Sequence, residues 1–269
     1  MKVDRTTERY FQLLDAVGQA VIATDASGLI ALWSRAAESL YGWRADEVIG
    51  RDVLEITPMD VSRARGAEIM QVLSRGELWS GEFEVRTRRG KSLKASVTDV
   101  PLLSDDQGVA GVIGVSAPSR APTTLQPLLK RFKLACNKVW PGQIFFEVSI
   151  SKKARVAATE PHMIQLLALL ILLHAEALDR GAEVEVIVGS AEKSPFTDFG
   201  LAFASSAAYV RIARRDAQPT FSVLRSLAFS AEPTKYTASL VRMVGGMLIA
   251  GTAPGRASAM HLFLPLESE

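Results

Sequence analysis

Residues 21–49 constrain the fold most, because their hydrophobic period changes from that of a strand to that of a helix. Two short apolar runs flank a turn in which Asp25 can accept a bond from an amide two residues on and Gly28 can adopt positive φ. After Ser34, alanine, leucine and tyrosine recur at helical spacing until Gly42. We therefore predict a β-hairpin that leads directly into short helices.

This stretch resembles the signature of the PAS domain family. The residues that carry the resemblance are Asp25, Gly28, Ile30, Trp33, Ser34, Ala36, Ala37, Glu38, Leu40, Tyr41, Gly42, Trp43, Glu47 and Gly50. Ser34 departs from the family, which most often has Asn there. Residues 76–83, 89–90 and 108–115 are similar to its fourth strand, next hairpin and last strand. The resemblance covers about residues 8–118 and implies a sensory or dimerisation domain.

The other patterns of the first half agree with an α+β domain. Alternation predicts strands over 82–88, 92–103 and 109–116, hence a five-stranded antiparallel sheet with helices on one face and a small apolar cavity. Helical spacing predicts a helix over 61–73, and 51–60 reads as a loop. Residues 6–17 form an amphipathic helix that either caps its own domain or packs on a second copy.

Residue types limit the cofactors of the predicted pocket. The only cysteine, Cys136, lies outside the domain, which argues against a covalent flavin adduct. The histidines all lie in the second half, which argues against His-ligated haem. A non-covalent flavin or another small molecule stays open; Trp33 and Trp79 could stack on a ring, although packing is the favoured role. The pocket residues that we predict are Ile22, Trp33, Met70, Trp79, Phe83, Val97 and Ile113.

Composition describes an ordinary globular chain of two domains. It has 269 residues, 48% hydrophobic and 22% charged, with a net charge of +2. No basic stripe with interleaved aromatic residues suggests a nucleic-acid partner. The single cysteine, the charged N-terminus and the lack of a long apolar run predict a cytoplasmic protein with no membrane segment. Prolines in 117–127 mark a linker, so we predict domains over 1–118 and 128–269, with the linker at 119–127.

The second half resembles the ATP-binding (GHKL) domain of histidine kinases, an α/β sandwich. Patterns predict helices over 125–136, 159–179 and 234–244, strands over 143–149, 155–158, 183–188 and 209–213, and a closing hairpin over 245–250 and 258–264. The similar pieces are 160–161 with 166–175, 241–249, and 254–255 with 258–266. This resemblance covers about residues 140–267.

Four departures from that family concern nucleotide binding and phosphoryl transfer. Leu170 and His174 stand where active members have Asn, one of which holds magnesium. The adenine motif keeps Asp216 but loses both glycines within 216–220. The loop over the phosphates, 232–236, has no glycine, and residues 119–142 contain no acceptor histidine. Gly245 and Gly246 belong to a structural turn.

These departures predict a degenerate nucleotide site at His174, Asp216 and Gly246, with no catalytic residue, no metal and no ATP–Mg. His174 reads as a core residue rather than a ligand, and Asp216 as a remnant rather than an adenine contact. The sequence therefore predicts a regulator of the bacterial two-component type, a PAS sensor joined to a pseudo-histidine kinase. Such a protein would form a homodimer and contact a response regulator or sensor kinase. The alternatives are a divergent sensor histidine kinase or ATPase that still binds ATP, and a second half that only dimerises.

Overall fold

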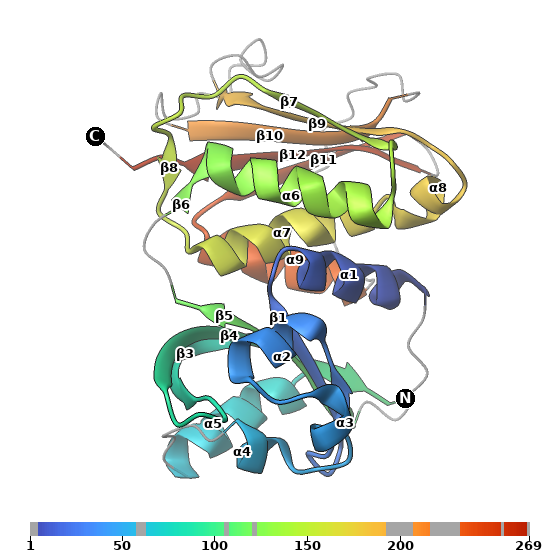
Figure 1. Cartoon of the computed structure of the whole chain (residues 1–269). Helices are drawn as coiled ribbons and strands as arrows, with labels where there is room; N and C mark the ends of the chain where they lie inside the picture. Colours follow the sequence, from blue (N-terminus) through green and yellow to red (C-terminus); the bar gives the residue numbers. More distant parts are fainter. Residues whose placement is uncertain are drawn as a thin grey trace. The chain divides into compact units, whose positions relative to one another are not determined.

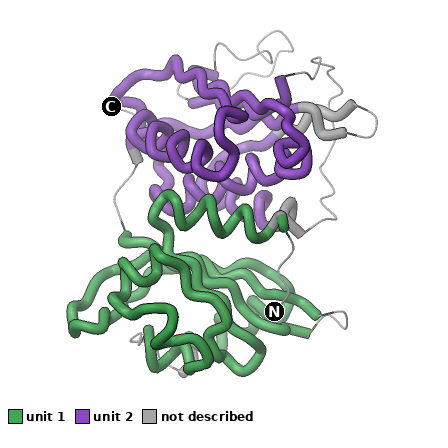
Figure 2. Tube along the Cα trace, turned by 45° about the vertical axis from the view of Figure 1, so that its right-hand side comes forward, with its two compact units in different colours: residues 1–119 green, residues 120–269 purple. Residues whose placement is uncertain are grey.

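The computed structural model describes residues 5–57, 63–104, 108–119, 123–191, 207–215, 232–253 and 256–267. The chain divides into two compact units, unit 1 over Met1–Ser119 and unit 2 over Arg120–Glu269 (Figure 2). Among the described residues, no helix has both the length and the apolar character needed to cross a bilayer.

Unit 1 is built on a five-stranded antiparallel sheet, as predicted, with the strand order β2-β1-β5-β4-β3 (Figure 1). The strands are β1 (Ala20–Asp25), β2 (Ile30–Trp33), β3 (Trp79–Arg86), β4 (Ser92–Leu103) and β5 (Val109–Pro118). The helices are α1 (Arg5–Ala16), α2 (Arg35–Tyr41), α3 (Ala45–Val48), α4 (Val53–Ile56) and α5 (Arg63–Ser74).

The predicted turn chemistry of residues 25–42 is confirmed. The Asp25 carboxylate accepts bonds from the amides of Ser27, at 2.9 Å, and Leu29, at 3.0 Å. Gly28 has φ 82°, a conformation that costs little only without a side chain. Ser34 caps α2 by accepting from the Ala37 amide, and Gly42 ends it in the left-handed conformation. Local side chains thus set both the hairpin and the first helix.

Residues 51–57 differ from the predicted loop. The short helix α4 lies there, and the Asp52 side chain accepts a bond from the Leu54 amide at 2.8 Å. An Asp cap satisfies an amide that the first turn leaves unpaired, which favours a helix too short for its period to be read. Residues 105–107, between the strands predicted over 92–103 and 109–116, lie outside the described residues.

Helices α2, α3 and α5 contact the sheet of unit 1 and close over the hydrophobic core. Helix α1 contacts β1 and α2, and the Asp15 carboxylate accepts a bond from the Ala36 amide at 2.7 Å, next to the start of α2. The leading helix therefore packs within its own domain; pairing with a second copy stays a prediction.

Unit 2 has a five-stranded mixed sheet in the order β11-β12-β10-β9-β7, in which β7 and β9 are parallel. Its strands are β7 (Ile144–Val148), β9 (Val184–Ser190), β10 (Ala207–Arg214), β11 (Met247–Ala253) and β12 (Arg256–Pro265). A separate two-stranded sheet consists of β6 (Thr123–Thr124) and β8 (Arg155–Val156). The helices are α6 (Leu125–Val139), α7 (Glu160–Leu172), α8 (Ala175–Asp179) and α9 (Glu232–Met243). Helices α6, α7 and α9 cover one face of this sheet (Figure 1).

The helix predicted over 159–179 is two helices, and His174 explains the break. Its Nδ1 lies 3.1 Å from the Leu170 carbonyl oxygen, the acceptor that its own amide would use in a continuous helix. The His174 amide instead donates to the Ile171 carbonyl at 2.9 Å. The side chain thus competes with the backbone ladder and ends α7.

Part of the linker predicted over 119–127 has regular secondary structure. Thr123 and Thr124 form β6, which pairs with β8, and α6 begins at Leu125. Pro127 therefore lies in the first helical turn, where a missing amide removes no hydrogen bond. Only part of the proline-rich stretch separates the two units.

Candidate functional site

The inner face of the unit 1 sheet, which looks toward α2–α5, is the candidate site. Cross-strand pairing places Ile22 opposite Gly114, Val97 opposite Ser116 and Phe83 opposite Ala95. Side chains of directly paired residues project from the same face of a sheet. Ile22, Phe83, Ala95 and Val97 belong to one core cluster with residues of the helices above them.

Five of the seven predicted pocket residues belong to this cluster or pack against it. Ile22, Trp33, Phe83 and Val97 are buried members, and the half-buried Trp79 packs on them with its ring stacked on Phe83 at 5.1 Å. The structure brings these five residues together, and whether they bind a ligand stays a prediction.

Two predicted pocket residues do not belong to the inner face. Ile113 pairs with Ala23, the neighbour of the inward-facing Ile22, so it projects from the opposite face. Met70 is 50% exposed on α5. The run around Ile113 is apolar at both parities, so the sequence could not tell its two faces apart.

The inner face also carries polar groups that the sequence analysis missed. The Tyr41 hydroxyl lies 2.9 Å from Ser116 Oγ, and both residues are buried. Asp99 lies on β4 two positions after Val97, and it pairs with Trp79 on β3 and Gly114 on β5. The sequence held one signal for it, because Asp99 has the same parity as the buried Ala95 and Val97.

Burial raises the pKa of the Asp99 carboxyl to about 7, and it is the only cause of that shift. Burial also raises the pKa of Tyr41 to about 12, with a smaller contribution from the Asp99 charge. At neutral pH the core therefore holds a phenol and a carboxyl that is poised between its charged and neutral forms.

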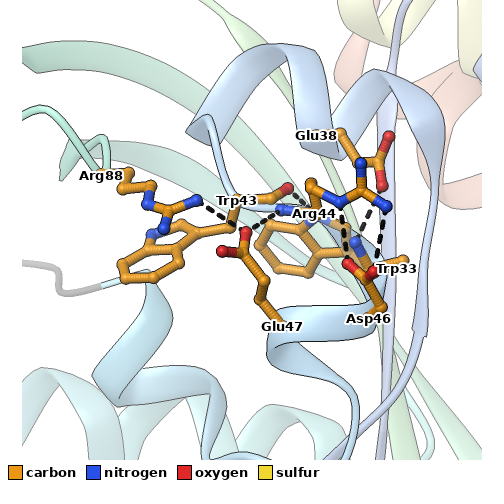
Figure 3. A network of polar contacts seen from close by, with 8 residues as sticks. Trp33, Glu38, Trp43, Arg44, Asp46, Glu47 and Arg88 are labelled. Atoms are coloured by element: carbon orange, nitrogen blue, oxygen red, sulfur yellow. Dashed lines mark hydrogen bonds and ion pairs between the residues drawn. The ribbon is translucent and has the colours of Figure 1, made fainter.

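A network of polar contacts around Trp43 joins the α2–α3 connection to the β3–β4 hairpin (Figure 3). The Arg88 guanidinium lies 4.7 Å from the Trp43 ring centroid and 2.7 Å from the Glu47 carboxylate. The Trp33 indole donates to the Trp43 carbonyl oxygen at 3.0 Å. This bond gives Trp33 a packing and anchoring role, the one favoured by its sequence context.

Of the degenerate nucleotide site predicted in unit 2, the structure describes His174 and Gly246; Asp216 lies outside the described residues. His174 is 3% exposed, and burial and then the charge of Arg214 lower its pKa, while its bond to the Leu170 carbonyl raises it. Because Nδ1 donates to that carbonyl, Nε2 is an acceptor, and it has no partner among the described residues. His174 is thus a neutral, buried side chain.

Gly246 has a structural role that agrees with the predicted turn. A Cβ at this position would lie 2.9 Å from the Phe263 carbonyl oxygen on β12, closer than side-chain carbons approach. Gly245 before it has φ 64°. Within the described ranges, no group of three or more His, Cys, Asp or Glu side chains could hold a metal ion.

The comparison with family models matches the PAS fold over residues 8–116. Residues 8–116 form a PAS domain. The PAS domain of a protein from Colwellia psychrerythraea is 22% identical to this chain with a TM-score of 0.37, over 42% of this chain and 95% of its own. A blue-light activated histidine kinase from Erythrobacter litoralis is 12% identical with a TM-score of 0.43, over 94% of this chain and 98% of its own. Among curated proteins nothing matches.

Proposed function

We propose that this chain is a cytoplasmic signalling regulator whose PAS domain senses or dimerises and whose unit 2 is a catalytically silent, histidine-kinase-like domain acting through protein contacts. The observation that carries the proposal lies on α7 and at its end. Leu170 is fully buried and its side chain has no oxygen, and His174 is buried and neutral. Magnesium prefers oxygen ligands, so these two positions offer it no side-chain ligand.

The architecture of unit 2 supports the kinase-like part of the proposal. A mixed sheet is covered on one face by α6, α7 and α9, and α7 is buried on every side, as the resemblance implies for the central helix of an ATP-binding domain. Gly246 is kept for close packing against β12. The elements that build a scaffold are present while the side chains that handle phosphate have changed.

Calorimetric titration of ATP–Mg into the full chain tests the proposal. We expect no binding stronger than about 1 mM, a level at which the free energy of association is only about 4 kcal/mol. A Kd in the micromolar range would overturn it. ATP without magnesium serves as the matched control, because a metal-dependent site loses affinity in that titration.

The rival function is a divergent kinase, and one observation favours testing it. His162 is only half-buried, with Nδ1 2.9 Å from Thr159 Oγ1, whereas His174 and His261 are buried. Incubation of the full chain with labelled ATP should give no protein-bound label. Label that disappears in His162→Ala but persists in His261→Gln would establish the rival.

The sensory part of the proposal concerns the inner face of the PAS sheet. We propose a non-covalently held small molecule there, with flavin as one class that visible absorbance of the purified chain detects directly. Dimerisation is tested by light scattering over a dilution series of the full chain. A mass that stays at one chain at all concentrations would remove the homodimer from the proposal.

A further inference from the structure

Asp99 is a partly buried carboxyl on the inner face of the PAS sheet. Among the residues that the structure describes, no hydrogen-bond donor or cation contacts its side chain, and the only interaction is the charge effect on Tyr41. A buried carboxylate without a partner is costly, so proteins normally pair it.

The Asp99 carboxyl lies against a glycine of the neighbouring strand β5. The carboxyl is desolvated enough for its pKa to rise to about 7, yet the residue keeps part of its accessible surface. Its neighbour on β5 is Gly114, and a Cβ there would lie 3.1 Å from Asp99 Oδ1. A side chain at position 114 would therefore crowd the carboxyl, and glycine allows the carboxyl to lie close to β5.

An aromatic wall stands across the strand from this carboxyl. Trp79 pairs with Asp99, but its ring leans along β3 over Gly81, where a Cβ would meet the indole at 2.4 Å, and stacks on Phe83. Asp99 leans instead toward β5. The two residues are paired on one face of the sheet, and the indole lies along β3 while the carboxyl points toward β5.

A hydroxyl pair completes this arrangement. Ser116 lies on the same face opposite Val97, and its Oγ is 2.9 Å from the Tyr41 hydroxyl. The inner sheet face offers a carboxylate, a hydroxyl and an indole, and α2 above it adds the Tyr41 hydroxyl. Carboxylates bind planar N–H donors in a bidentate manner, and an indole face attracts cations and flat rings.

We propose that this face of the PAS domain binds a small, planar, positively charged ligand with N–H donors, such as an amidinium or a protonated aminoheterocycle, through Asp99, the Tyr41–Ser116 hydroxyls and the Trp79 ring. This inference rests on the proposed sensory role of the domain and specifies the chemistry of its ligand. The ligand supplies the donors that Asp99 lacks.

Three probes of one shape and different charge test the proposal on the full chain: benzamidinium, benzamide and benzoate. Saturation-transfer NMR and quenching of tryptophan fluorescence measure binding at pH 8, where Asp99 is mostly ionised. We expect benzamidinium to bind at least tenfold more tightly than benzoate, with benzamide between them. Lowering the pH to 5 should weaken benzamidinium, because a proton then occupies the carboxyl.

Variants separate the site from non-specific attraction. Asp99→Asn keeps the shape and removes the charge, so the preference for benzamidinium over benzamide should disappear. Glu84→Gln removes an exposed carboxylate of β3 and should change nothing. Tyr41→Phe, which removes one hydroxyl, should weaken benzamidinium severalfold and serves if Asp99→Asn folds poorly.

Equal binding of benzamidinium and benzoate, equal binding by wild type and Asp99→Asn, or no binding of any probe at 10 mM overturns the proposal. Those outcomes leave the proposed silence of unit 2 untouched, because the ATP–Mg titration tests it separately. Conversely, micromolar ATP binding would remove the regulatory role of unit 2 and not the ligand class of the PAS domain.

Discussion

Replacing Asp99 with Asn should stabilise unit 1, and the gain should grow with pH. The folded state holds the pKa of Asp99 at about 7, against a reference value of 3.8. The folded state therefore binds more protons than the unfolded state between these two values. The contribution of Asp99 to the free energy of unfolding is therefore greatest at low pH and is lost as the pH rises through 7. Asn mimics the protonated carboxyl at every pH.

The size of the effect follows from the shift. Each unit of pKa is worth about 1.36 kcal/mol, so the full shift predicts that the advantage of Asp99→Asn grows by about 2.5 kcal/mol between pH 5 and pH 8. Asp99 keeps some accessible surface, and water screening reduces this growth to about 1–2 kcal/mol. Tyr41, which the Asp99 charge affects, has a pKa of about 12 and stays neutral throughout.

Urea unfolding of wild type and Asp99→Asn at several pH values measures this difference. Tryptophan fluorescence reports mainly on unit 1, because Trp33, Trp43 and Trp79 lie there and only Trp140 lies in unit 2. The difference between the variants cancels the opposing contribution of His261, whose pKa burial lowers to about 4. A difference that stays constant within about 0.5 kcal/mol from pH 5 to pH 8 would refute the reasoning, since an unshifted carboxyl gives no slope.

Three further substitutions test packing and polar contacts. Gly246→Ala should destabilise unit 2 by about 1–3 kcal/mol in urea unfolding, because the new Cβ meets a β12 carbonyl, whereas Gly66→Ala, with open space around it on α5, should be neutral or stabilising. Arg88→Ala should cost unit 1 about 1 kcal/mol and Arg88→Lys less, and a loss that is unchanged in high salt would contradict the ion-pair part of this account. Tyr209→Phe removes the hydroxyl 2.7 Å from His261 Nδ1 and should cost unit 2 about 1–3 kcal/mol, with a matching fall in the urea midpoint; an unchanged midpoint would show that this bond is dispensable.

Local chemistry was readable from the sequence wherever one residue decides the backbone. Asp25, Gly28, Ser34 and Gly42 each act through a turn or cap within a few residues, and each behaves in the structure as its type predicts. The strand period over 82–88 likewise predicted β3, because one buried face imposes alternation there, whereas β4 is buried on both faces over 95–98.

Predictions failed where the local pattern did not decide which face a residue takes or where a helix ends. Around Ile113 both parities are apolar, so only pairing with β1 decides that Ile113 leaves the inner face. The apolar run of α7 gives no sign of its end, because the His174 side chain ends the helix by bonding four residues back. Met70 followed the helical period yet lies exposed, since the helix turns another face to the sheet.

By itself the sequence determined most of the strands and longer helices, their order and the loss of asparagine and glycine from the second half, since these depend on residue types and short spacings. Only the tertiary structure placed Asp99, Trp79 and Ser116 on one sheet face and brought Tyr41 of α2 to Ser116. These residues come from four elements, and strand register together with the packing of α2, which no local pattern encodes, brings them together. The desolvation that raises the pKa of Asp99 is likewise a property of the packed domain rather than of any segment.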